Sequence, residues 1–442
     1  MTKVFIETYG CTLNQAESDI MAAILKERGH ALAVTESDAD VILINTCTVK
    51  GATENKIIER LKKLGDAGRI FVVAGCLSAD EARLRKFAPD APIVKTMAIA
   101  RIADAVEDAM AGQATIFRDY EPKENLPRQF SAPILRVPVN DGCVGHCNYC
   151  QTKMARPFLR SYSPKAIAKW INEGVARGAR EIQLTSQDLG AYGLDIRTDL
   201  LKLMEHLNRD DSEGRRNALF AGTGPVSSPD PQFMIRLGMI NPNHASRMRE
   251  GLAQILLQPN IYRFLHIPLQ SGSEKVCKEM ERDHTVSEFE QLVAFMRERV
   301  PQITVATDLI AGYPTESEED FQQTLELVRR VRPDIVNVSK FSPRPGTRAK
   351  EMKQIDNNTI KRRSTELSSL VREISRERNR ALVGNEFRVL ITEKQRDFTG
   401  RTPAYKQVVV RDFKGKLGDF INVKITDANH GSLFGGISVN DD

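Results

Sequence analysis

The chain has 442 residues, of which 41% are hydrophobic and 27% charged, and its formal net charge is +5. This length predicts two or three domains. No apolar run approaches the roughly 20 residues that cross a bilayer, which excludes a membrane-spanning segment. The amino terminus enters a strand-like run without an apolar export signal, so we expect a cytoplasmic protein with no membrane partner.

Strand-like and helix-like runs alternate in the first 112 residues. An apolar run of strand length is followed each time by an amphipathic stretch, which predicts a parallel sheet covered by helices. We therefore expect an N-terminal α/β domain at 1–112. The expected strands are 4–8, 41–46 and 70–74, and the expected helices are 14–27, 53–64 and 79–87.

Three cysteines of this domain fall at or just beyond the ends of the three expected strands. They are Cys11, Cys47 and Cys76. Parallel strands present their carboxyl ends along one edge, so these distant cysteines are expected to converge in one crevice. Three separate buried core thiols are the alternative interpretation.

A second domain is expected at 131–348, after a polar linker near residues 118–125. Six strand-like runs separated by helical stretches predict a partial parallel (β/α)6 barrel, whose functional groups collect at the carboxyl ends of the strands. Residues 210–233 interrupt the rhythm and are expected to form a long loop or insertion. The six expected strands are 134–139, 181–185, 235–239, 264–269, 303–310 and 334–340.

The carboxyl-terminal part combines a basic helix with a small β-barrel. Residues 344–381 contain eleven Lys and Arg against five Asp and Glu, and we expect a basic helical linker at 349–381. Its charge suits either a solvated helical face or a surface for phosphates. Alternating runs between glycines at 382–442 predict a small antiparallel barrel.

The strongest chemical signal is the cysteine loop that follows the first barrel strand. Cys143, Cys147 and Cys150 have the spacing C-x3-C-x2-C. Three thiolates at this spacing suit a four-iron cluster whose fourth iron stays open to an exogenous ligand. A zinc site with His146 as its fourth ligand is the alternative.

This loop resembles the radical S-adenosylmethionine (SAM) superfamily, and several further segments resemble its methylthiotransferase family along nearly the whole chain. The resemblance implies that SAM binds the open iron of a 4Fe-4S cluster and is cleaved after one-electron reduction. The segments that carry it are Thr8-Tyr9-Gly10-Cys11, Asn45-Thr46-Cys47, Ala74-Gly75-Cys76, Leu265-His266-Ile267-Pro268-Leu269-Gln270-Ser271-Gly272-Ser273 and Thr307-Asp308-Leu309-Ile310-Ala311-Gly312-Tyr313-Pro314.

The family resemblance implies a second 4Fe-4S cluster on Cys11, Cys47 and Cys76, which receives sulfur and carries it to the substrate. It also implies two SAM-dependent events. One SAM donates the methyl group, and another yields the 5′-deoxyadenosyl radical that removes the C2 hydrogen of an adenosine.

The resemblance also indicates residues that contact SAM. Tyr149 matches an aromatic residue beside SAM, and Ser186, Gln187 and Asp188 end the second barrel strand, where relatives hold the amino group and ribose. Helix capping is the alternative for Ser186 and Asp188. Gln270 and Ser271 end a later strand and are expected to contact SAM or substrate, although Ser271 also suits a helix cap.

The last segment resembles the TRAM domain, a small RNA-binding barrel, which implies a tRNA substrate. Arg401, Tyr405 and Lys406 are expected to contact phosphates and stack on bases. An exposed turn without RNA contact is the alternative.

Residues 151–156 resemble the archaeal and eukaryotic branch that acts on N6-threonylcarbamoyladenosine next to the tRNA anticodon. Lys153 or Arg156 is expected to pair with the threonyl carboxylate, or alternatively with acidic neighbours or the cluster's surroundings. The implied partners are the tRNA anticodon stem-loop, a flavodoxin- or ferredoxin-like electron donor and a sulfur donor. The alternatives are an isopentenyladenosine tRNA or ribosomal-protein methylthiotransferase, or a non-catalytic RNA-binding iron–sulfur protein.

Overall fold

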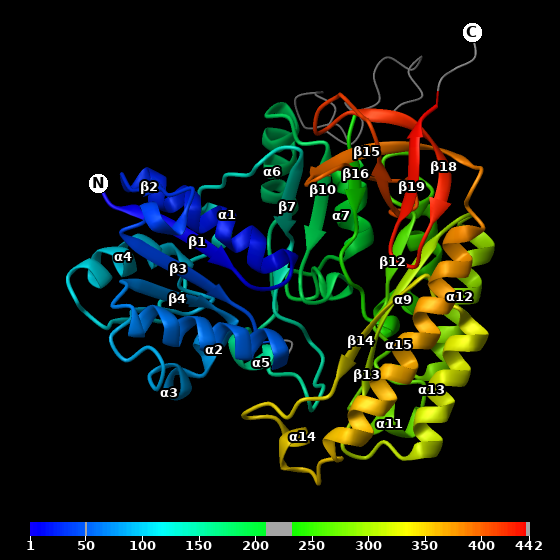
Figure 1. Cartoon of the computed structure of the whole chain (residues 1–442), viewed down its shortest axis with the longest axis horizontal. Coiled ribbons are helices and arrows are strands. Elements are labelled where there is room, and N and C mark those ends of the chain that lie inside the picture. The colour runs from blue at the N-terminus through cyan, green and yellow to red at the C-terminus, as the bar shows by residue number, and fades with distance from the viewer. Residues whose placement is uncertain (49–50, 209–231, 439–442) are drawn as a thin grey trace.

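The computed structural model describes residues 1–48, 51–208 and 232–438. Three domains follow one another along the chain. An N-terminal α/β domain lies at one side, a central barrel of strands and helices lies beside it, and a small β-barrel sits against one end of the central barrel (Figure 1).

The N-terminal domain is a six-stranded parallel sheet of order β2-β1-β3-β4-β5-β6, flanked by helices. The expected parallel α/β fold is confirmed. Strand β6 lies beyond residue 112, where we expected the domain to end, because it completes the sheet by pairing with β5. The elements are β1 (Lys3–Thr8), α1 (Thr12–Glu27), β2 (Ala31–Leu32), β3 (Val41–Thr46), α2 (Gly51–Asp66), β4 (Phe71–Gly75), α3 (Glu81–Leu84), β5 (Ile93–Val94), α4 (Ile102–Met110) and β6 (Ile116–Phe117).

The central domain has six parallel strands in chain order, which confirms the partial barrel. They form two three-stranded sheets that meet where Ile235 bridges Ile261. Strands β11 and β12 end earlier than the expected 235–239 and 264–269, because the chain leaves the regular ladder there and Pro268 has no N–H to donate. The strands are β7 (Ile134–Pro138), β10 (Glu181–Thr185), β11 (Met234–Arg236), β12 (Phe264–His266), β13 (Thr304–Ala311) and β14 (Ile335–Lys340).

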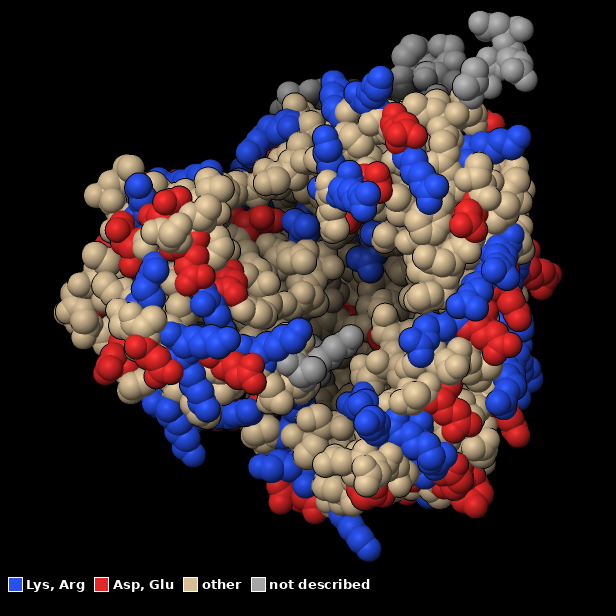
Figure 2. Space-filling model, in the orientation of Figure 1, with Lys and Arg blue, Asp and Glu red and all other residues tan. Residues whose placement is uncertain are grey.

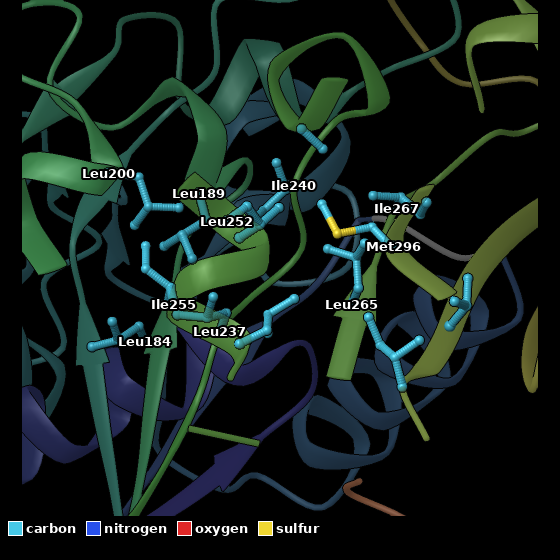
Figure 3. Packing of buried hydrophobic residues seen from close by; sticks show 14 of the residues in the cluster. Leu184, Leu189, Leu200, Leu237, Ile240, Leu252, Ile255, Leu265, Ile267 and Met296 are labelled. Atoms are coloured by element: carbon cyan, nitrogen blue, oxygen red, sulfur yellow. The ribbon is translucent and has the colours of Figure 1, made fainter. Parts of the chain in front are cut away.

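Alternate residues of these strands face opposite sides, as the pleat requires. Residues such as Leu184, Leu237 and Leu265 point outward into the main core beneath the surrounding helices (Figure 3). Their neighbours Met234 and Phe264 belong to a separate cluster inside the barrel. The barrel strands therefore separate two packed regions: the main apolar core beneath the helices and a second cluster inside the barrel.

The central domain has helices between its strands, and several of them begin with side-chain caps. Ser163 caps α6, whose first residue is Pro164, and Ser317 forms a capping box with Asp320 at the start of α13. These helices are α5 (Thr152–Ala155), α6 (Pro164–Ala176), α7 (Leu200–Asn208), α9 (Pro242–Arg247), α10 (Arg249–Leu256), α11 (Glu274–Glu279), α12 (Val286–Arg299), α13 (Glu318–Val331) and α14 (Arg348–Glu351).

A long helix, α15 (Asn357–Arg380), packs along β14 and α13 and leads into the terminal barrel. That barrel is closed, with the order β15-β16-β17-β19-β18. Its strands are antiparallel as expected, except that β17 and β19 pair in parallel to close the barrel. The strands are β15 (Glu386–Lys394), β16 (Phe398–Arg401), β17 (Gln407–Val410), β18 (Phe420–Ala428) and β19 (Leu433–Ile437).

The expected insertion at 210–233 lies outside the described residues except for Gln232, which is exposed, and Phe233, which is buried in the main core. Within the described parts of the chain, every helix is too short or too polar to cross a membrane.

Candidate functional site

The cysteine loop lies at the carboxyl end of β7, as expected. Cys143, Cys147 and Cys150, called here the loop trio, are all half-buried free thiols. The loop turns tightly, since the backbone N–H of Gly145 donates to Cys143 Sγ at 3.3 Å and that of Cys150 donates to the Cys147 carbonyl. Gly142 adopts φ +78°, and a Cβ there would lie 2.1 Å from the Phe158 carbonyl oxygen. Glycine is therefore required for the loop to leave the strand.

Two side chains from the barrel bring N–H groups to this trio. Arg282 Nη1 donates to Cys147 Sγ at 3.1 Å, and its Nη2 donates to Asn241 Oδ1 and to the Pro268 carbonyl. Asn241 Nδ2 in turn lies 3.9 Å from Cys143 Sγ. A guanidinium and an amide facing thiol sulfurs are groups that stabilise thiolates and tune clusters bound to them.

The donor set fits a 4Fe-4S cluster. Burial, with the nearby charge of Asp188, raises the pKa of the Cys143 thiol to about 12, so its thiolate needs a positive partner such as iron. Among the described residues, no three Cys, His, Asp or Glu side chains are gathered as a single metal ion requires. Three cysteine thiolates are the ligands that hold a 4Fe-4S cluster with one iron left open.

The residues at the end of β10 lie beside the loop trio. Gln187 Oε1 accepts the backbone N–H of Gly142 at 2.8 Å, and Ser186 Oγ is buried without a hydrogen-bond partner in the described structure. Asp188 accepts from Gly190 N, Asn241 and His244 and caps a short 3-10 helix. Burial opposes its charge, but the hydrogen bonds from His244 and Asn241 hold the pKa of Asp188 below its usual value. Asp188 therefore acts as a helix cap, which was the alternative interpretation of this residue.

The segment after β12 reaches the same edge. Gln270 has φ +80°, a strained conformation for a residue with a side chain, and bridges Leu309 of β13. Ser271 is fully buried and accepts the N–H of Ser273, while Ser273 itself caps α11. The cap expected at Ser271 thus belongs to Ser273. Tyr149 packs against the cluster of Val276, Met280, Tyr313, Phe341 and Ala349.

Cys11, Cys47 and Cys76, called here the N-terminal trio, lie together at the carboxyl edge of their sheet. Cys11 is exposed and precedes the first turn of α1, whereas Cys47 and Cys76 are buried. Burial is the main cause that raises the pKa of Cys76 to about 12; the charge of Arg156 opposes it, and Glu17, Cys11 and Cys47 add to it. Gly75, with φ +87°, lets Cys76 leave β4 where a Cβ would meet the Thr46 carbonyl at 2.4 Å.

Helix α5 connects the two trios. At its start, Lys153 Nζ donates to the Cys143 carbonyl at 2.7 Å. Just beyond its end, Arg156 Nη2 lies 3.9 Å from Cys76 Sγ. Gln151 also contacts Thr48 of the N-terminal domain, and Ala155 accepts a hydrogen bond from Thr96. The fold therefore brings the two trios to opposite sides of one short helix.

Arg156 is buried, with both guanidinium ends paired to carboxylates. Its nitrogens lie 2.6 Å from Glu17 of α1 and 2.6 Å from Asp141, and Lys123 pairs with the same two acids. Two of the interpretations offered for Arg156 match the structure: it pairs with acidic neighbours, and it lies beside the N-terminal trio. Its expected pairing with a threonyl carboxylate is not supported. The four charges tie the N-terminal domain to the barrel.

A hollow opens between the N-terminal domain and the rest of the molecule, and Lys and Arg side chains stand at its rim and within it (Figure 2). The carboxyl ends of both parallel sheets meet here, because α1 packs on β7 and α5 packs on the turn that begins at Cys76. A basic hollow beside two groups of thiols suits an anionic substrate such as RNA.

Two of the three residues expected to contact RNA in the terminal barrel, the buried Lys406 and the half-buried Tyr405, lie at its junction with the central barrel. Lys406 Nζ donates to Asp334 Oδ1 at 2.9 Å and to Asn379, and Tyr405 OH donates to Glu181 at 3.2 Å. In this structure both side chains join the two barrels, and RNA contact by Lys406 and Tyr405 stays a prediction. Arg401 is half-buried, stacks on Tyr405 and lies 3.6 Å from Glu393.

The basic helix also uses part of its charge internally. Arg362 and Arg363 pair with Glu318, Arg363 also pairs with Glu316, and Arg378 pairs with Asp334. The sequence suggested either a solvated helical face or a surface for phosphates. Fewer of its guanidinium groups are available than either interpretation assumes, because several of them pair with acids beside α13 and β14.

Arg282 and Asn241 are functional-site residues that sequence reasoning missed. Both lie outside the cysteine motifs, and only the fold brings them to the loop trio. The available signal was weak: Asn241 follows the third barrel strand, and Arg282 follows the helix after Gln270–Ser273.

Family comparisons match all three domains. Residues 3–96 match the family described as Uncharacterized protein family UPF0004, residues 137–328 match the Radical SAM superfamily, and residues 380–437 match the TRAM domain. Among solved structures, the radical SAM methyltransferase TsrM of Kitasatospora setae aligns over 77% of this chain and 75% of its own, with a TM-score of 0.54 at 12% identity. That likeness concerns the fold.

Full-length relatives share one name. A Pyrococcus horikoshii protein named "Probable threonylcarbamoyladenosine tRNA methylthiotransferase" is 37% identical over 99% of this chain and 100% of its own length. A Methanothermobacter thermautotrophicus protein of that name is 39% identical over 96% and 97%. The Drosophila melanogaster threonylcarbamoyladenosine tRNA methylthiotransferase is 34% identical over 98% of this chain and 77% of its own. With these matches along its whole length, the chain belongs to the radical SAM family of threonylcarbamoyladenosine tRNA methylthiotransferases.

Proposed function

We propose that this protein is an enzyme that replaces the C2 hydrogen of N6-threonylcarbamoyladenosine, next to the tRNA anticodon, with a methylthio group. The observation that carries the proposal is the position of the two cysteine trios on opposite sides of α5, where Lys153 contacts Cys143 and Arg156 contacts Cys76. Methylthio transfer needs a site that generates a radical and a site that delivers sulfur to the same carbon. Two cysteine trios beside one basic hollow support both radical generation and sulfur delivery.

Membership of the radical SAM superfamily implies SAM and a 4Fe-4S cluster, which the loop trio is suited to hold. We propose a second 4Fe-4S cluster on the N-terminal trio. When bound, these groups supply one-electron cleavage of SAM to a 5′-deoxyadenosyl radical and a sulfur atom that a second SAM methylates.

The protein's own part is to position these groups and exclude side reactions. Arg282 and Asn241 hold N–H groups at the loop sulfurs, and Gln187 fixes the loop through Gly142. We propose Ser186, Gln187, Gln270 and Tyr149 as SAM contacts, since they line the edge beside the loop. Asp188 and Ser271 serve that edge by holding its backbone and its neighbours.

The proposed macromolecular substrate is the tRNA anticodon stem-loop. The TRAM domain supports RNA binding, and Arg401 keeps a partly accessible position. A flavodoxin- or ferredoxin-like protein would supply electrons, and a separate donor would supply sulfur. We place the protein in the cytoplasm, because all seven cysteines are free thiols and the proposed chemistry uses six of them as thiolates.

The test is a comparison of two tRNA substrates. Reconstituted, reduced protein is incubated with SAM and tRNA carrying either the threonylcarbamoyl or the isopentenyl modification, and digested nucleosides are measured by mass spectrometry. We expect a mass increase of one methylthio group on the threonylcarbamoyl nucleoside only. Methylthiolation of the isopentenyl nucleoside alone would reject the proposed substrate.

A further inference from the structure

The interior of the central barrel contains a layer of polar side chains directly above its apolar floor. The floor includes Met234, Phe264, Ala306 and Ile335, one residue from each of four neighbouring strands. Two residues further along each strand stand Arg236, His266, Asp308 and Asn337. Residues two apart on a strand point to the same face, so these four side chains form the next layer towards the carboxyl edge.

This layer lies below the loop trio. Five residues after Arg236, Asn241 approaches Cys143 Sγ at 3.9 Å, and two residues after His266, the Pro268 carbonyl accepts from the arginine that contacts Cys147. The layer is open to solvent. The side chains of His266 and Asp308 are 15% and 25% exposed, and Asn337 is exposed. A group entering the barrel beneath the loop would meet these side chains.

Asp308 already has hydrogen-bond partners within the layer. Its carboxylate receives His266 Nε2 at 3.0 Å and Asn337 Nδ2 at 2.8 Å. The floor carboxylate, Glu181, is likewise engaged by the hydroxyl groups of Tyr262 and Tyr405 and by the amide of Gln183. Both acids therefore already have hydrogen-bonding side chains as neighbours.

Arg236 is the layer's cation, and it is held by aromatic rings. Its guanidinium carbon lies 5.2 Å from the centroids of both Phe264 and Tyr405. In the described structure it forms no ion pair, and its Nε is buried without a hydrogen-bond partner. Rings orient a guanidinium through cation–π contact but leave its N–H groups unused. A half-buried arginine with unused donors suits a planar anion that enters the barrel.

We propose that Arg236 is a specificity-determining residue that binds the threonyl carboxylate of the substrate, with the His266–Asp308–Asn337 group beside it in the same layer. This inference rests on the proposed function and identifies the part of the chain that recognises its modified base. The sequence predicted that Lys153 or Arg156 binds this carboxylate. We assign that role to Arg236 instead, because Lys153 already contacts the Cys143 carbonyl and Arg156 already pairs with Glu17. A carboxylate is the chemical feature that separates this nucleoside from an isopentenyl one.

The test uses three synthetic anticodon stem-loop RNAs. They carry threonylcarbamoyladenosine, its threonyl methyl ester, or unmodified adenosine. For reconstituted wild type and each variant, kcat/KM is measured with the first two RNAs, and Kd is measured for all three by fluorescence anisotropy. The variants are Arg236→Gln, Arg236→Lys, which keeps the charge, and Arg330→Gln, which removes an exposed arginine on α13 far from the layer.

The wild type and Arg330→Gln should prefer the acid over the ester by roughly ten- to hundredfold, the range for a hydrogen bond to a charged group. Arg236→Gln should bring this ratio close to one, and Arg236→Lys should retain part of it. An unchanged acid-to-ester ratio in Arg236→Gln, or no preference in the wild type, overturns the inference while leaving methylthiolation intact. If the wild type modifies none of these RNAs, the proposed function fails, and the Kd ratios still decide the role of Arg236.

Discussion

Single charged residues at the domain junctions have partners that the sequence does not reveal. Arg156 and Lys123 share Glu17 and Asp141, and Lys406 shares Asp334 with Arg378. Each of these cations reads in the sequence as an available surface charge. In the fold Arg156, Lys123 and Lys406 are buried, and a buried charge persists only if it is paired. Their first role is therefore to fasten domains.

Replacing Arg156 by Met should destabilise the protein strongly. It leaves Glu17 and Asp141 buried with Lys123 as their remaining cation, and losing one partner of a buried pair costs about 3 kcal/mol or more. The measurement is the free energy of urea unfolding. Arg28→Met is the matched control, because Arg28 is half-exposed in its pairs with Asp104 and Glu107 and should cost less than about 1 kcal/mol. Equal losses in the two variants would contradict the assigned role of Arg156.

At the level of secondary-structure elements, strands and helices with a clear period are predictable, and so is the convergence of both cysteine trios. The six barrel strands and the parallel N-terminal sheet follow from buried apolar runs such as 181–185. What could not be predicted is contact between elements distant in sequence. Arg282 at Cys147, Arg236 above Phe264 and the burial of Tyr405 all depend on how barrels and loops pack.

The junction of α15, β14 and the terminal barrel should be sensitive to acid. Burial raises the pKa of Asp334, but the charges of Lys406 and Arg378 outweigh this and hold it below its usual value. A lowered carboxyl pKa in the folded state gives stabilisation that is complete above the unfolded pKa of about 3.9 and is lost as pH falls through the folded pKa.

We therefore expect Asp334→Asn to lower the thermal midpoint of cluster-free protein at pH 7. The gap between variant and wild type should shrink as pH is lowered below about 4, because the wild-type carboxyl is then protonated too. Calorimetry from pH 7 to pH 3 measures this. A gap that is constant over the whole range would show that the charge of Asp334 does not stabilise the junction.

On the scale of the whole molecule, the N-terminal domain is docked so that its cysteine edge faces that of the barrel. Beyond the α5 contacts, Arg344 Nη1 donates to Glu54 Oε2 of α2 at 2.7 Å, and both side chains are buried. Ser342 lies so close to Gly51 that an added Cβ would approach its hydroxyl at 2.8 Å. These contacts fix the separation of the trios, so docking and sulfur transfer are linked.

Arg344→Met should loosen that docking without touching the loop trio. We expect SAM cleavage to continue and methylthio transfer to fall by about 10- to 100-fold, since small misplacements of reacting groups have effects of this size. The two products are quantified in the same reaction, and hydrogen exchange of α2 should rise in the variant. Arg348→Met is the control, because Arg348 is 79% exposed and pairs with Glu281 on the surface. Parallel loss of both products in Arg344→Met would mean that the barrel itself is disturbed.

The separate tasks of the two cysteine trios are tested most directly by measuring 5′-deoxyadenosine and methylthiolated nucleoside in Cys143→Ala and Cys47→Ala. The account predicts that Cys143→Ala releases no 5′-deoxyadenosine, whereas Cys47→Ala still releases much of the wild-type amount and forms no methylthiolated nucleoside. Wild-type release of 5′-deoxyadenosine by Cys143→Ala, or methylthio transfer by Cys47→Ala, would contradict it.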